Sequence, residues 1–114
     1  MDTLNKARVN IMISDINQSL VFYVNTLGLK LLKRYGDHYA ELDANGFMIA
    51  LHPTTKDVIR GNSVSIGLGV FNFDETIRHL EEKGVKFSIE KGGFIRLAHF
   101  TDPDGNPLFL AENK

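Results

Sequence analysis

The chain of 114 residues has no cysteine and no tryptophan, only three prolines, and no excess of either charge. Without cysteine it has no disulfide, no thiol nucleophile and no thiolate metal ligand, so a metal would need His, Asp or Glu. Thirteen basic against fourteen acidic residues leave nothing to neutralise a phosphate backbone, so nucleic acid is not an expected partner. No apolar run approaches the roughly 20 residues of a membrane span, and the polar start lacks the apolar core of a secretion signal. We therefore expect a cytoplasmic protein without a membrane partner.

The chain contains the same order of secondary-structure elements twice. Apolar alternation predicts a strand over 9–13. Asp15 then opens a helix, with Gln18 in the capping-box position, and Gly28 closes that helix. Three short strands follow, at residues 29–35, 39–43 and 47–51, and the last two are joined by a tight turn at Asn45-Gly46, where both positions tolerate positive φ.

The second half repeats this order. A strand over 64–71 precedes a helix that Asn72 caps and Gly84 closes, and strands at 85–89, 94–100 and 108–111 follow. Both halves therefore predict β-α-β-β-β within one α+β domain, residues 1–114, with module one at about 8–52 and module two at about 63–112. A half of about 57 residues would not bury a good core by itself.

Strand periodicity assigns one face of each sheet to the helix and leaves the other face for a different contact. On that other face we expect small, polar and a few bulky residues, which suit the wall of a ligand cleft. The expected lining residues are Arg8, Asn10, Met12, Met48, Ala50, His52, Ser65 and Phe109.

The motifs resemble those of the vicinal oxygen chelate superfamily, which includes glyoxalase I, extradiol dioxygenases and bleomycin-resistance proteins. Ser14-Asp15-Ile16, Ser19-Leu20, Phe22-Tyr23 and Leu27-Gly28-Leu29 look like the first-helix pattern of that family, and the segment 100–108, FTDPDGNPL, resembles its closing hairpin. The resemblance covers residues 8–112. It implies two βαβββ modules that form a cupped mixed β-sheet with helices on the outer face. It also implies a homodimer, in which modules of two chains complete each cup.

Metal-using relatives hold a divalent ion at four positions, and the resemblance places Arg8, Ala50, Ser65 and Phe109 at these positions. A cation, a methyl group, a neutral hydroxyl and a phenyl ring do not form an ordinary divalent-metal site. We therefore expect no metal and no cofactor. The alternative is an unusual metal site built from His52, Glu112 and a further histidine such as His38 or His99.

Two further side chains are candidates for the pocket. His38 is an imidazole that titrates near neutrality, and Arg96 could orient an anionic or carbonyl-bearing ligand. No residue is assigned a catalytic role. The sequence predicts a metal-independent protein that binds a small molecule, sequestering an antibiotic or a metabolite, with an aromatic, neutral or anionic ligand favoured by Arg8. The alternative function is a metal-dependent lyase, isomerase or dioxygenase of the same superfamily.

Overall fold

A computed structural model describes residues 2–55, 58, 61, 64–91 and 93–113. The chain divides into two compact units, Met1–Ile59 and Arg60–Lys114, and each unit contains one module. The sequence also predicts a loop over 53–62, either a lid or the link between the modules, and a turn at Gly92-Gly93; both lie partly outside the described residues. Each module is described by itself below.

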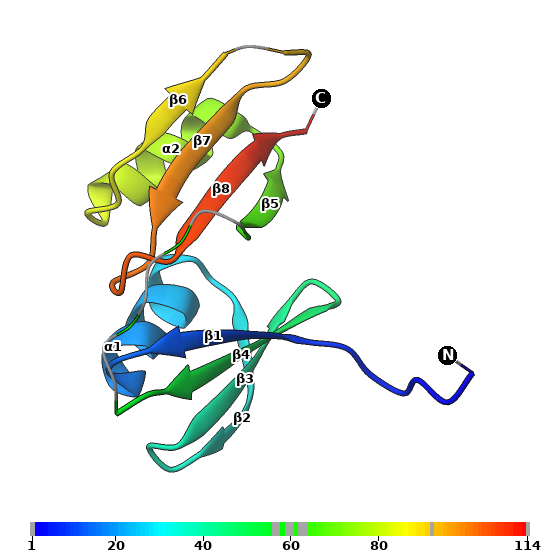
Figure 1. The fold of residues 1–114 in the computed structure, drawn as a ribbon. Coiled ribbons are helices and arrows are strands. Elements are labelled where there is room, and N and C mark those ends of the chain that lie inside the picture. The colour runs from blue at the N-terminus through cyan, green and yellow to red at the C-terminus, as the bar shows by residue number, and fades with distance from the viewer. Residues whose placement is uncertain (1, 56–57, 59–60, 62–63, 92, 114) are drawn as a thin grey trace. The chain divides into compact units, whose positions relative to one another are not determined.

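Module one consists of β1 (Val9–Ile13), a helix in two parts, α1 (Ile16–Leu20) and η1 (Val21–Thr26), and the strands β2 (Lys30–Tyr35), β3 (Tyr39–Ala44) and β4 (Phe47–Pro53) (Figure 1). The strand order is β1-β4-β3-β2. The pair β1–β4 is parallel and the other two pairs are antiparallel. This is the predicted β-α-β-β-β order.

The helix of module one begins as predicted and continues differently. The Asp15 side chain accepts a hydrogen bond of 3.0 Å from the Gln18 amide, and Gly28 follows the helix with a φ of +82°. From Val21 to Thr26, however, the helix has π rather than α geometry, and the Leu27 amide donates to the Phe22 carbonyl at 2.9 Å. Apolar residues three and four apart suit both geometries over one turn, so the spacing alone did not reveal the π segment.

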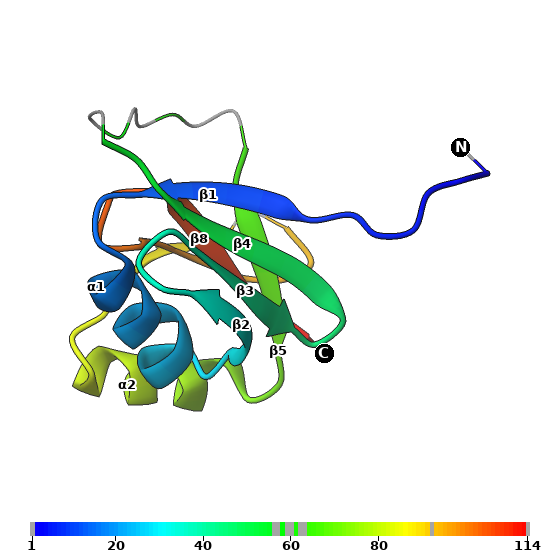
Figure 2. The same ribbon diagram turned by 90° about the horizontal axis from the view of Figure 1, so that it is seen from below.

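Module two consists of β5 (Ile66–Val70), α2 (Phe73–Glu82), β6 (Ser88–Glu90), β7 (Leu97–Thr101) and β8 (Pro107–Glu112), with the strand order β5-β8-β7-β6 (Figure 1). Figure 2 shows α2 and the strands β5 and β8 from a second side. The pair β5–β8 is parallel, and β6–β7 and β7–β8 are antiparallel. Two predicted strands begin three residues too early: β6 begins at Ser88 rather than at 85, and β7 at Leu97 rather than at 94. Phe94, which we placed in a strand, lies in the β6–β7 connection and is 99% exposed.

The start of α2 also differs from the prediction. Asn72 occupies the N-cap position, but it has left-handed backbone angles (φ +53°) and its side chain makes no capping hydrogen bond. Its carbonyl instead accepts from the Thr76 amide at 2.9 Å, and the Thr76 hydroxyl donates to the Phe71 carbonyl. The end of the helix is as predicted, with Gly84 at a φ of +96°.

The helix-side residues of both sheets form the cores. Ile13, Leu42, Ile49 and Leu51 are fully buried in module one, and Leu108 and Leu110 are almost fully buried in module two. The Asn45-Gly46 turn has the predicted positive φ values, +54° and +99°. None of the described helices is long and apolar enough to cross a membrane.

Candidate functional site

The open face of module one, the side of its sheet away from the helix, is an ordered array of side chains. Register places Asn10 opposite Ala50 and Ala50 opposite Glu41, and places Met12 opposite His52. Residues opposite each other in a sheet share a face. Asn10 and Met12 are exposed, and Ala50 is fully buried. These predicted lining residues therefore lie on one face, as strand periodicity indicated.

Tyr39, at the start of β3, is the centre of a cluster on this face. The Arg8 guanidinium carbon lies 5.9 Å from the centre of its ring, within the range of a cation–π contact. The His52 ring packs edge-on to it, with 6.4 Å between ring centres, and the Tyr35 ring lies 6.0 Å away. We call Arg8, Tyr35, Tyr39, Glu41 and His52 the Tyr39 platform.

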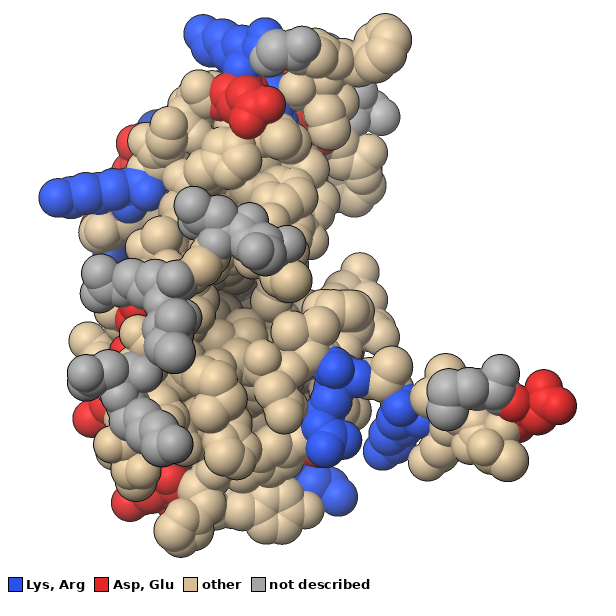
Figure 3. All heavy atoms as spheres, in the orientation of Figure 1, with Lys and Arg blue, Asp and Glu red and all other residues tan. Residues whose placement is uncertain are grey.

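The platform has a polar as well as an aromatic character. The Tyr39 hydroxyl donates a hydrogen bond of 3.0 Å to Oε2 of Glu41. Desolvation and this carboxylate raise the pKa of Tyr39 above its ordinary value, and the nearby Arg8 cation partly opposes the change. Lys and Arg side chains also gather where the N-terminal segment joins this sheet (Figure 3).

Two other predicted residues of module one lie outside the Tyr39 platform: His38 in a turn, and Met48 on the same open face as Ala50. His38 is exposed in the β2–β3 turn, where its amide donates to the Tyr35 carbonyl at 3.0 Å. Met48 is half-buried on β4, opposite Asp43. Neither has a recorded contact with the Tyr39 platform, so their roles in the pocket stay predictions.

In module two, Phe109 lies against a glycine strand. A Cβ built on Gly67 would stand 2.3 Å from Cζ of Phe109 and 2.5 Å from Cε2, so the ring occupies the space that a side chain at residue 67 would need. The His99 ring lies 5.9 Å from the Phe109 ring, and its Nε2 donates to Oε1 of Glu90 at 2.9 Å. The predicted position of Phe109 on the open face is consistent with its pairing to Gly67 and His99.

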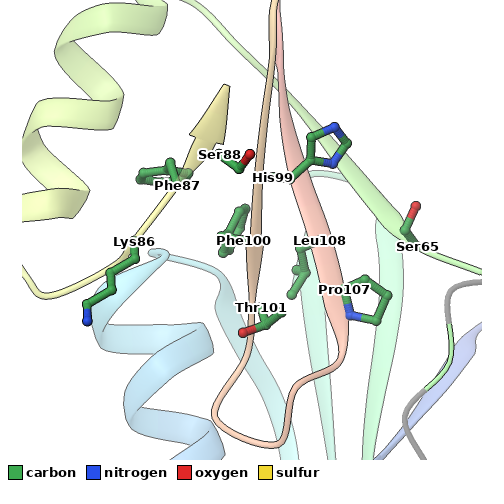
Figure 4. A pocket seen from close by; sticks show the side chains of 9 residues that line it. All are labelled: Ser65, Lys86, Phe87, Ser88, His99, Phe100, Thr101, Pro107 and Leu108. Atoms are coloured by element: carbon green, nitrogen blue, oxygen red, sulfur yellow. The ribbon is translucent and has the colours of Figure 1, made fainter. Parts of the chain in front are cut away.

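Module two also has a hollow of about 530 Å³ at one end of its sheet. Figure 4 shows side chains from the start of β5, the segment leading into β6, and strands β7 and β8 around it. Described residues that line it are Ser65, Lys86, Phe87, Ser88, His99, Phe100, Thr101, Pro107 and Leu108. Its volume lies in the range of about 300–1,000 Å³ typical of small-molecule pockets. Of the predicted site residues, Ser65 lies here.

Arg96 lies on the helix side of module two. Its guanidinium binds the Asp74 carboxylate through Nη1 and Nη2 at 2.9 and 3.0 Å, and binds Oε2 of Glu112 at 2.8 Å. It also lies 4.8 Å from the centre of the Phe73 ring. These bonds connect the first turn of α2 to the end of β8, and they lower the pKa of Asp74. Arg96 is thus in a structural network, apart from Phe109 and His99, and a contact to ligand stays a prediction.

The donor set does not suit the divalent ion that metal-using relatives hold. Arg8 is a cation placed over a ring, Ala50 ends in a buried methyl group, and Phe109 fills the space over Gly67. Both carboxylate oxygens of Glu112, the acid of the alternative site, are bonded to Arg96. Within the described parts of the chain, no three His, Asp or Glu side chains are grouped as metal ligands would be.

Two groups on the open faces were missed by the sequence reasoning. Glu41 has the same strand parity as Tyr39, so extending the alternation to β3 would have found it. Lys86, Ser88 and Thr101 come together only through the β6–β7 register. The observed β6 has only three residues and begins three residues later than the strand predicted at 85–89, so no sequence signal fixed that register.

Comparisons with known proteins agree with the motifs. The profile of the Glyoxalase/Bleomycin resistance protein/Dioxygenase superfamily matches residues 6–109. A lactoylglutathione lyase of Salmonella typhimurium is 28% identical over 120 residues, covering 90% of this chain and 87% of the relative.

Solved structures show the same fold. A glyoxalase family protein from Enterococcus faecalis has a TM-score of 0.81 at 23% identity, covering 98% of this chain and 100% of the other. TnmS3, described as an antibiotic binding protein from Streptomyces sp. CB03234, has a TM-score of 0.76 at 25% identity, covering 98% of both chains. The match to the family profile over almost the whole chain confirms the resemblance in the motifs: the chain belongs to the Glyoxalase/Bleomycin resistance protein/Dioxygenase superfamily.

Proposed function

We propose that this protein binds a small molecule without a metal ion, sequestering an antibiotic or a metabolite on the open faces of its modules. The main support is Phe109, whose ring takes the space over Gly67 at a position where metal-using relatives have a carboxylate. A phenyl ring supplies surface for packing and no metal ligand.

Module one supports the same proposal. The Arg8 guanidinium lies over the Tyr39 ring, and within the described residues no carboxylate forms an ion pair with it. A planar ligand could stack on Tyr39 or Tyr35 while its acceptor atoms take hydrogen bonds from Arg8. This chemistry favours an aromatic ligand that is neutral or anionic. The name of TnmS3 offers the precedent of an antibiotic binding protein within this fold.

Metal analysis tests the first half of the proposal. Protein purified without chelator is analysed for Ni, Zn, Fe and Mn by mass spectrometry, alone and after incubation with each ion. We expect less than stoichiometric metal, and no change in melting temperature on adding EDTA. Stoichiometric metal that is lost in His52→Ala would instead establish the alternative, a metal-dependent lyase, isomerase or dioxygenase.

Ligand screening tests the second half. A ligand that binds the native state raises the melting temperature, by an amount set by its concentration relative to Kd. We expect positive shifts within a panel of aromatic acids, amides and antibiotics, reduced in Arg8→Gln. Arg78→Gln on the exposed side of α2 is the matched control. Flat shifts over the whole panel would contradict the proposal.

The proposal includes the homodimer that the family resemblance implies. Light scattering coupled to gel filtration measures the mass directly, and we expect twice the 12.8 kDa of one chain. A mass of one chain at micromolar concentration would contradict the dimer and leave the ligand tests unaffected.

A further inference from the structure

The hollow of module two has a distinctive set of hydrogen-bond donors. Ser88 pairs with His99 in the β6–β7 register, and continuing that register by two residues sets Lys86 opposite Thr101. Lys86, Ser88, His99 and Thr101 therefore share the open face of the sheet. Their side chains supply an ammonium group, two hydroxyl groups and an imidazole within one hollow.

The charge of this hollow has one sign. Among the described residues that line it, Lys86 is the one with a full charge, and none is acidic. The nearby Glu90 is bonded to Nε2 of His99 at 2.9 Å and is not a lining residue. No carboxylate of a described residue pairs with Lys86. An exposed ammonium group with hydroxyl donors beside it favours an anion.

The rest of the lining is apolar and aromatic. The Phe87 and Phe100 rings meet edge to face, with 5.2 Å between their centres, but Phe100 (5% exposed) and Leu108 (1% exposed) belong to the core on the helix side. Of the apolar lining, Pro107 pairs with Thr101 and shares its face. The apolar part of a ligand whose charged substituent lies at Lys86 would therefore contact Pro107 and the His99 ring.

From this arrangement we propose that the hollow of module two binds the anionic group of an aromatic ligand, with Lys86, Ser88 and Thr101 as its donors and Pro107 and His99 beside the ring. The inference rests on the proposed function and makes it more specific, because it places the acidic group of the ligand in module two. It predicts a preference for aromatic acids over their neutral amides.

A matched pair of probes tests this preference. 2-Naphthoate and 2-naphthamide have the same ring and nearly the same shape, and they differ in charge. Each is titrated into the ¹⁵N-labelled full chain, and amide shifts give both Kd and location. We expect naphthoate to move the amides of 86–88 and 99–101, and to bind about two- to five-fold more tightly, the size of one exposed charge contact. The preference should decrease as salt is added.

Three variants test whether the preference for naphthoate depends on the proposed donors or on the charge of the protein as a whole. Lys86→Gln should abolish the preference for naphthoate while naphthamide binds as before. Lys91→Gln, which removes the same charge from an exposed residue outside the recorded lining, should leave the preference intact. Thr101→Val removes a hydroxyl at constant shape and should weaken naphthoate; circular dichroism verifies that each variant is folded.

The outcomes distinguish this inference from the proposed function. Equal affinity for both probes, or an equal response to Lys86→Gln and Lys91→Gln, overturns the anion site and leaves small-molecule binding in place. Shifts at Tyr39 and Arg8 without shifts at 86–88 also overturn it, and place the ligand on module one. If neither probe nor any compound of the thermal panel binds, both proposals fail.

Discussion

The two modules have the same strand order and the same pairing directions, yet their open faces differ chemically. In module one, β3 contributes Tyr39 and Glu41, and the face combines rings with charges of both signs. In module two, β5 contributes Gly67 and Gly69, and the neighbouring Phe109 covers the first of them.

This difference shows how one scaffold can be kept while its surface chemistry changes. The buried residues between sheet and helix are mostly apolar in both modules, because burying them stabilises each sheet against its helix. The open-face residues are not needed for that packing, so cations, rings, hydroxyls and glycines are all compatible with the same topology. Function in such a fold depends on the side chains of the site rather than on the architecture.

The largest effect should come from truncating the shared core. Leu42 is fully buried in module one and Leu110 is 2% exposed in module two. Leu42→Ala and Leu110→Ala should each lower the free energy of unfolding by about 2–5 kcal/mol, measured by urea denaturation. The exposed Leu4 provides a control, Leu4→Ala, with an effect within about 0.5 kcal/mol.

The same experiment tests whether the modules are equivalent. A half of about 57 residues buries too little surface to be stable alone, so both truncations should shift one common transition. A second transition that responds to only one of them would show that the modules unfold separately.

The glycines of β5 should give the next largest effect. Gly67→Ala forces the Phe109 ring to move and should cost about 1 kcal/mol. Gly69→Ala, with no atom within 4 Å of the new Cβ, should be neutral or slightly stabilising. Chemical denaturation measures both. In a Phe109→Leu background the cost at Gly67 should shrink; an unchanged cost would mean that the ring is not its cause.

The Arg96 network should make module two sensitive to acid. Arg96 lowers the pKa of Asp74, so the pair stabilises the fold above the ordinary aspartate pKa of about 3.9. That contribution is lost as the pH falls through the lowered pKa of the folded protein. Thermal melts from pH 7 to pH 2 should therefore show a smaller acid-dependent loss in Asp74→Asn than in the parent chain. Equal pH profiles would exclude this contribution, and the exposed Asp37→Asn provides the control.

The smallest effect should be on the titration of the Tyr39 phenol in module one. The pKa of Tyr39 is raised by burial and by Glu41, so the stabilisation from its neutral phenol is present below about pH 10 and is lost as the pH rises through its folded pKa. Absorbance near 295 nm measures phenolate formation. Tyr39→Phe should remove one phenolate transition from the titration, and Glu41→Gln should move that transition to lower pH. A titration unchanged by Glu41→Gln would contradict the carboxylate as a cause.

Much of the fold followed from local patterns. Period-two alternation located the strands, Asp15 and Gly28 bounded the first helix, and Asn45-Gly46 marked a turn whose conformation few other residues adopt easily. The errors of the prediction were confined to short segments. The π geometry over 21–26 and the short β6 depend on packing and pairing that a three- or four-residue spacing does not encode.

The candidate site, like the fold, could be predicted from the sequence only in part. Strand parity was sufficient to place Asn10, Met12, Ala50 and Phe109 on open faces, since a strand has only two faces. Parity did not reveal which side chains meet, because contact between strands depends on register. Arg96 illustrates this: its partners Asp74 and Glu112 lie 22 and 16 residues away.

By itself, the sequence determined the repeated β-α-β-β-β order and the absence of thiolate chemistry. These are properties of residue type and periodicity, which the chain has before it folds. Tertiary structure decided the rest: that Arg8 lies over Tyr39, that Phe109 covers Gly67, and that Lys86 joins Ser88 and Thr101 at one hollow. Each of these depends on strand pairing between segments distant in sequence, and pairing is settled by the packing of the whole module.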